Sequence, residues 1–131
     1  MIEDPDLYRL FKAESGQHLA RLEEDLLRLE QSPADPALLE EAFRESHSLK
    51  GAARVLGLVR IESAALGLES VFNAARKGEA PLTPDIVTRL NQALGELRER
   101  VQEALAGGDM AEPASPRPSA PTQPPAASSR K

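Results

Sequence analysis

The segment from Asp35 to Gly57 reads DPALLEEAFRESHSLKGAARVLG. Its Asp-Pro pair is typical of a helix start, because the aspartate side chain caps free backbone N–H groups and proline fits the first turn. A glycine such as Gly57 is typical of a helix end. Between these signals, residues suited to a buried face recur every three or four positions: Leu39, Ala42, Phe43, Ser46, Leu49, Ala53 and Leu56. The segment is therefore predicted to form one amphipathic helix.

The chain before this segment repeats the same pattern. Asp4 and Pro5 form a second start signal, and Ser32 and Pro33 form a stop. We expect a helix from about residue 5 to residue 31, with a stripe at helical spacing: Leu7, Leu10, Phe11, His18, Leu19, Leu22, Leu26 and Leu29.

Two further helices are predicted after Gly57. The first carries an apolar stripe from Ile61 to Ala75, and Gly78 ends it just after Arg76 and Lys77, the basic residues that a helix C-terminus favours. Thr83 and Pro84 open the second. Its stripe repeats at the same spacing: Val87, Leu90, Leu94, Leu97, Val101 and Leu105.

Four amphipathic helices with short connections favour an all-α, antiparallel up-down four-helix bundle. All 19 leucines lie in this part of the chain, beside only eight isoleucines and valines, so no strands are expected. The predicted domain covers residues 1–108. Residues 109–131 hold six of the 11 prolines and no Leu, Ile, Val or aromatic residue, so we expect a disordered linker that begins after Gly107 and Gly108.

Composition excludes several classes of function. The net charge of −5 disfavours nucleic acid as a partner. No apolar run is long enough for a membrane span, and the acidic start MIEDPD is unlike a secretory signal, so a cytoplasmic location is expected. The absence of cysteine excludes disulfides and thiol catalysis. No helix carries a second apolar face, so a monomeric domain is expected.

Polar residues on the helix of Asp35–Gly57 are the candidates for chemistry. They are expected on the face opposite the apolar stripe, with an imidazole in solvent and an ammonium one turn further on: Glu40, Arg44, His47, Lys50, Gly51 and Arg54. A glycine inside a helix is unfavourable, so Gly51 suggests close approach of another molecule to His47. For an arbitrary helix, however, such residues form only a solvated surface.

The string AFRESHSLKGAARVLGL, residues 42–58, resembles the phosphoacceptor helix of histidine phosphotransfer (HPt) domains at the N-terminus of chemotaxis-type histidine kinases. The string LESVFNAARKGE, residues 68–79, is similar to the family's third helix and the turn after it, and the resemblance covers nearly all of residues 1–106. It implies a four-helix phosphorelay module in a parent histidine kinase. Hybrid members with their own receiver domain often have a similar Lys-Gly-Ala-Ala-Arg run.

The resemblance also implies roles for individual residues. His47 becomes the phosphorylated residue, Glu69 the carboxylate that orients its imidazole, and Lys50 the cation that contacts the phosphoryl group. Ser48 and Arg54 flank the site. Arg44, Gly51 and Arg54 are the residues expected to dock a partner, and the family's frequent second histidine is replaced by Leu66, which simplifies the hydrogen-bond network.

The implied partners are a histidine kinase catalytic domain and the receiver domain of a response regulator. No glycine-rich nucleotide loop occurs in the chain, so these partners are expected to bring ATP and magnesium. His18 is predicted to be a partly buried packing residue, and the spacing of His18 and His47 does not indicate a metal site. Four aromatic residues are predicted in the core: Tyr8, Phe11, Phe43 and Phe72.

Two alternatives belong to other classes of protein. One is a helical adaptor that binds partner helices without phosphorylation. The other is a small self-standing enzyme, which is disfavoured because the chain offers no catalytic pair beyond His47 and Glu69. Labelling of the chain by a kinase and ATP distinguishes the phosphorelay module from the adaptor.

Overall fold

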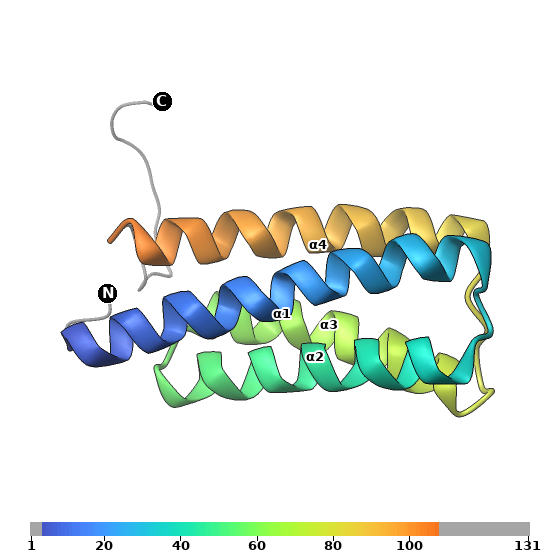
Figure 1. Ribbon diagram of the computed structural model, residues 1–131, viewed down its shortest axis with the longest axis horizontal. Coiled ribbons are helices and arrows are strands. Elements are labelled where there is room, and N and C mark those ends of the chain that lie inside the picture. The colour runs from blue at the N-terminus through green and yellow to red at the C-terminus, as the bar shows by residue number, and fades with distance from the viewer. Residues whose placement is uncertain (1–3, 108–131) are drawn as a thin grey trace.

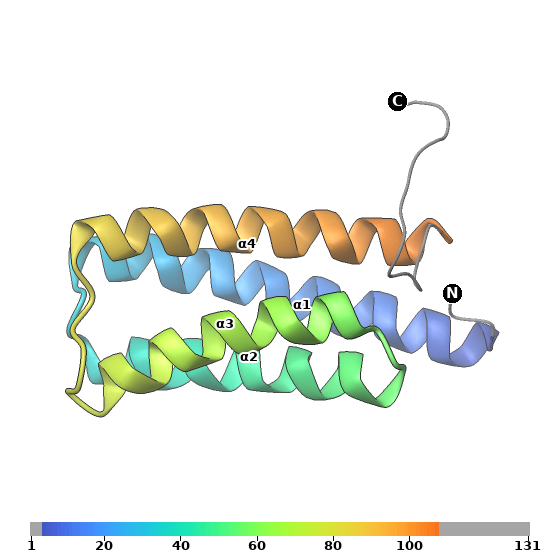
Figure 2. The ribbon, with the colours of Figure 1, turned by 180° about the vertical axis from the view of Figure 1, so that it is seen from behind.

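The computed structural model describes residues 4–107 and consists there of four α-helices without strands. They are α1 (Pro5–Gln31), α2 (Pro36–Val55), α3 (Val59–Arg76) and α4 (Pro84–Leu105). Figure 1 shows them side by side with alternating direction, and Figure 2, from behind, shows α3 and α4 in front. Each helix packs against its two neighbours in the ring, so the predicted antiparallel up-down bundle is confirmed.

The capping signals of the sequence mark three of the four helix starts. The side chains of Asp4, Asp35 and Thr83 accept hydrogen bonds from backbone N–H groups in the first turns of α1, α2 and α4, and proline follows each of them. The exception is α3, where Leu58 offers no side-chain cap. Its start at Val59 could not be read from a capping residue.

Three helices are followed by a glycine with positive φ. The values are 71° at Gly57, 76° at Gly78 and 79° at Gly107. This left-handed backbone conformation closes a helix and is unfavourable for residues with a Cβ atom. The predicted stops at Gly57 and Gly78 are therefore explained, while the predicted linker of residues 109–131 lies outside the described residues.

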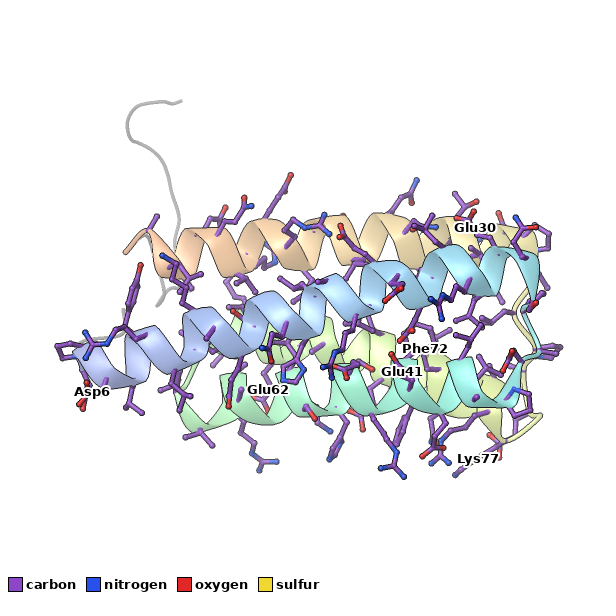
Figure 3. The ribbon with its side chains drawn as sticks, in the orientation of Figure 1. Asp6, Glu30, Glu41, Glu62, Phe72 and Lys77 are labelled. Atoms are coloured by element: carbon purple, nitrogen blue, oxygen red, sulfur yellow. The ribbon has the colours of Figure 1, made fainter. Side chains whose placement is uncertain are left out.

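The predicted stripes meet in one core that runs the length of the bundle. Phe11 of α1 and Phe72 of α3 are its largest fully buried side chains, and Figure 3 shows Phe72 inside the bundle. Leucines from all four helices fill the remainder, including Leu22, Leu49 and Leu97. Burial of these apolar side chains is what holds the helices together.

The first turns of α1 depart from the prediction. Leu7 and Leu10 were expected on the buried stripe and are exposed, because α1 extends beyond the ends of its neighbours there (Figure 1). Tyr8, expected in the core, is only half-buried, and its hydroxyl donates a hydrogen bond of 2.9 Å to the backbone oxygen of Leu105. Tyr8 thus ties the start of α1 to the last turn of α4.

Candidate functional site

His47 lies on the outer side of α2, directly after a buried position. Ser46 is fully buried, and its hydroxyl donates to the backbone oxygen of Ala42 at 2.8 Å, so it points inward. The next residue on a helix is turned by about 100°. The His47 side chain is 61% exposed as a result, which agrees with the prediction of an imidazole in solvent.

Glu69 of α3 faces His47 across the α2–α3 seam. Its Oε2 atom lies 2.8 Å from Nδ1 of the imidazole, and its side chain is only 12% exposed. Helices α2 and α3 are antiparallel neighbours, so residues distant in sequence meet at matching heights. The expected pairing of Glu69 with His47 is therefore present in the structure.

Two opposing effects act on the pKa of Glu69. Burial raises it, but contact with Lys50 and the hydrogen bond with His47 lower it, and the net pKa lies below the usual 4.5. An ionised carboxylate can only accept hydrogen bonds, so Nδ1 of His47 must carry the shared proton. In the neutral imidazole, this leaves the lone pair on Nε2.

Lys50 departs from its predicted position. It was expected on the solvent face, yet its side chain is only 21% exposed, and its ammonium lies 2.7 Å from Oε1 of Glu69. The long lysine stem bends toward α3 because the carboxylate attracts the charge. One carboxylate thus bridges the imidazole and the ammonium, so Lys50 lies beside His47.

The remaining predicted site residues are spread along the same face. Arg44 is exposed and pairs with Glu40 one turn away at 2.6 Å, and Arg54 is exposed with its Nε atom 3.9 Å from Glu62. A Cβ atom placed on Gly51 would meet nothing within 4 Å. No contact within the described residues therefore requires glycine at this position.

Ser48 and Leu66 complete the surroundings of the site. Both are exposed, and Leu66 lies on α3 one turn before Glu69. The imidazole of His47 contacts Glu69, and the simplified hydrogen-bond network expected from Leu66 stays a prediction.

Phe43 and Arg76 were not recognised from the sequence as part of this site. Phe43 was predicted in the core, but it is only half-buried, and its ring stacks on the imidazole of His47. Arg76, the last residue of α3, places its guanidinium carbon 4.2 Å from the centre of the Phe43 ring. The only sequence signal for the contact between Phe43 and His47 was their spacing of four residues, which places two side chains next to each other on a helix.

His18 is partly buried, as predicted, and has a polar partner that the sequence did not reveal. Its side chain is 20% exposed, and Nδ1 lies 2.6 Å from Oε1 of Glu45 on α2. The other oxygen of Glu45 lies 3.3 Å from Arg21. The prediction missed Glu45 because the relative register of α1 and α2 cannot be derived from either helix alone.

Within residues 4–107, no group of three His, Cys, Asp or Glu side chains is arranged to hold a metal ion. None of the four helices is long and apolar enough to cross a membrane. The expectation that partners bring ATP and magnesium stays a prediction.

Comparison with known proteins relates this geometry to a family. The model of the family described as "Hpt domain" matches residues 6–111. The chain is 37% identical over 100 residues to chemotaxis protein CheA of Bacillus subtilis, covering 76% of this chain and 15% of the relative. It is 32% identical over 108 residues to the gliding motility regulatory protein of Myxococcus xanthus, covering 81% and 14%. The chain therefore spans only a small part of these curated relatives.

Two solved structures share the fold. The CheA phosphotransferase domain from Thermotoga maritima matches with a TM-score of 0.71 and 29% identity, over 76% of this chain and 95% of that one. The phosphorylated P1 domain of CheA3 from R. sphaeroides, solved in complex with CheY6, matches with a TM-score of 0.73 and 31% identity, over 78% and 80%. Sequence and structure agree that this chain belongs to the Hpt domain family and is homologous to the phosphotransfer domains of CheA proteins.

Proposed function

We propose that His47 is the phosphoryl carrier of a two-component phosphorelay. The exposed imidazole that carries this proposal is held at Nδ1 by Glu69, which leaves the Nε2 lone pair as the nucleophile. The similar P1 domain of CheA3 is described as phosphorylated and in complex with CheY6, which supports the same role here.

In the proposed reaction, Nε2 of His47 attacks the γ-phosphorus of ATP held by a kinase domain. The N–P bond forms while the bond from phosphorus to the leaving ADP oxygen breaks. The proton on Nδ1 stays in the hydrogen bond to Glu69, whose negative charge stabilises the positive charge that develops on the ring. In the second transfer, an aspartate carboxylate of a receiver domain attacks phosphorus and the N–P bond breaks.

Lys50 contributes electrostatic stabilisation in this proposal. Its ammonium lies beside the imidazole and can turn from Glu69 toward the incoming phosphoryl oxygens. Charge stabilisation and positioning are most of what a protein offers phosphoryl transfer. ATP and magnesium come with the kinase and receiver partners.

Partner docking is assigned to the surface around His47. Arg44 and Arg54 are exposed on either side of it, and the open space at Gly51 allows a partner backbone to approach the imidazole. We place this reaction in the cytoplasm, on a monomeric domain of a larger histidine kinase.

A labelling experiment tests the proposal. The chain is incubated with a chemotaxis kinase core, ATP and magnesium, and intact mass is recorded before and after acid treatment. The expected result is one added phosphate that is lost in acid and survives in alkali, as for phosphorus on nitrogen. The chain with ATP and magnesium alone should not label, because its sequence contains no glycine-rich nucleotide loop to hold and align a γ-phosphate. An acid-stable product would overturn the assignment to histidine, and the absence of any product with a competent kinase core would favour the adaptor.

A further inference from the structure

The ring of Phe43 contacts the proposed phosphoacceptor. Phe43 lies one turn before His47 on α2, with ring centres 6.0 Å apart and ring planes 20° from parallel. Phe43 is half-buried and packs against the hydrophobic core, which limits the movement of its ring. It therefore provides a fixed surface beside an otherwise exposed imidazole.

Arg76 restrains the Phe43 ring from the neighbouring helix. Its guanidinium lies over that ring in a cation–π contact. The same guanidinium donates hydrogen bonds to Oε1 of Glu40 at 3.3 Å and to Oδ1 of Asn73 at 3.1 Å. Contacts to α2 and α3 thus fix its position, so Phe43 is held by both helices that frame the site.

The hydrogen bond to Glu69 alone does not orient the imidazole fully. It selects the edge of the ring that faces α3, but the ring can still swing about the N–H···O direction. A stacked neighbour limits that swing because it favours one ring plane. Edge and plane together determine where the lone pair of Nε2 points. In-line phosphoryl transfer depends strongly on this direction.

We propose that Phe43, held by Arg76, is a positioning residue that sets the ring plane of His47 for phosphoryl transfer. This inference rests on the proposed function of His47. Core packing alone does not require an aromatic ring at residue 43, because a leucine fills a half-buried apolar position on a helix. The distinguishing property of Phe43 is its flat face against the imidazole.

Nuclear magnetic resonance of the unphosphorylated chain tests the contact without any kinase. Phe43→Leu should remove the ring-current shift that the stacked phenyl ring imposes on the carbon-bound protons of His47. The matched control is Phe72→Leu, the same substitution in the buried core of α3. It should lower the melting temperature and leave the His47 protons unchanged. Unchanged His47 shifts in Phe43→Leu would overturn the inference.

Kinetics with the kinase core test the consequence. In Phe43→Leu, kcat for phosphorylation should fall by about two- to ten-fold, the range that corresponds to the energy of aromatic pairs, with KM for the domain unchanged. Phe43→Tyr keeps the ring and should restore kcat. Arg76→Gln should give a smaller fall in kcat, also without a change in KM.

The outcomes separate this inference from the proposed function. Wild-type labelling with an equal kcat in Phe43→Leu would overturn the positioning role and leave His47 as the phosphoacceptor. If kcat falls equally in Phe43→Leu and Phe72→Leu, the loss is due to lower stability, and the positioning role of Phe43 is overturned as well. Failure of the wild type to label at His47 would overturn the proposed function, while the proton shifts would still report whether Phe43 sets the ring plane.

Discussion

His18 and His47 occupy two versions of one arrangement, at the α1–α2 seam and the α2–α3 seam. In each, Nδ1 contacts a glutamate on the following helix, Glu45 at 2.6 Å and Glu69 at 2.8 Å. In each, the second oxygen of that glutamate contacts a cation three residues after the histidine, Arg21 at 3.3 Å and Lys50 at 2.7 Å. The bundle thus contains the same arrangement of a histidine, a glutamate and a basic residue twice.

The two sites differ in access to the imidazole. The side chain of His47 is three times as exposed as that of His18, at 61% against 20%. One turn after His47 lies Gly51 with open space around it, whereas one turn after His18 lies the fully buried Leu22. Under the proposed function, a carboxylate and a cation are therefore not expected to be sufficient for a phosphoryl carrier. A partner must also reach Nε2.

The sites also differ in their other charged neighbours. Asp25 of α1 is 2% exposed, its Oδ2 atom has no hydrogen-bond partner, and Glu41 lies across the seam (Figure 3). Burial, together with the charge and hydrogen bonding of Glu41 and the charges of Glu45 and Glu24, raises the pKa of Asp25 to about 7. The His18 side of the bundle therefore contains an acidic cluster around the buried Asp25.

The largest expected effect is the loss of labelling in His47→Gln. This substitution removes the proposed nucleophile, so phosphate incorporation should vanish, and the melting temperature should barely change because the side chain is exposed. His18→Gln is the matched control and should label like the wild type. Mass spectrometry after incubation with the kinase core measures both. Loss of label in His18→Gln with His47 intact would reverse the assignment of the two sites.

Next in size is the effect of removing each glutamate. Glu69→Ala deletes the acceptor at Nδ1 and should slow phosphorylation by about ten- to a thousand-fold, as is typical for positioning groups. Glu45→Ala should keep the rate and lower the free energy of unfolding by about 1–2 kcal/mol, since His18 and Arg21 lose a buried partner. Rapid-quench labelling and urea denaturation separate the two effects. Equal rates in both variants would mean that Glu69 is only a surface charge.

A smaller effect follows from making the His47 site resemble that of His18. Gly51→Leu should slow phosphoryl transfer by about ten-fold by obstructing the approach of partners. It should also stabilise the domain by about 0.5–1 kcal/mol, because leucine favours helix over glycine and a Cβ atom meets no neighbour there. Gly51→Ala should keep the gain in stability with little loss of rate. A wild-type rate in Gly51→Leu would contradict the docking role of this position.

The acidic cluster is expected to affect stability and its pH dependence but not the rate of phosphoryl transfer, which makes its effect on function the smallest. The folded pKa of Asp25 is about 7 against 3.8 for the unfolded residue, so the folded state binds the extra proton between these values. Its contribution to stability is therefore lost as pH rises from about 4 to 7 and is constant above. Asp25→Asn should raise the free energy of unfolding by about 1–3 kcal/mol at pH 8, with a smaller difference at pH 4. Asp85→Asn, an exposed control, should show neither change.

The sequence was sufficient for the helices because their signals are local. In each Asp-Pro or Thr-Pro pair, the first side chain caps the first turn of its own helix and proline follows. These pairs therefore predict the starts of α1, α2 and α4. The start of α3 had no such signal. Leu7 and Leu10 were misjudged because a stripe shows which face of a helix is apolar but not how far the neighbouring helices extend.

Only the site residues that lie in a family motif could be predicted from the sequence. His47 and Glu69 follow from the resemblance to the family, and the structure brings them together as expected. The inward turn of Lys50 and the stacking of Phe43 depend on what α3 presents opposite α2, which no single helix reveals. The same limit applies to Glu45 and Asp25, whose partners lie across the α1–α2 seam.

The ion pair of Lys50 and Glu69 would also affect how readily a phosphoryl group on His47 is transferred onward. A phosphoryl group on Nε2 brings about two negative charges beside a cation that is already paired. Glu69 competes with that group for Lys50 and repels it. In the proposed phosphohistidine state, the N–P bond would therefore keep a high group-transfer potential, which would favour onward transfer to an aspartate. A site without the carboxylate would bind phosphate better and be a poorer intermediate in a relay.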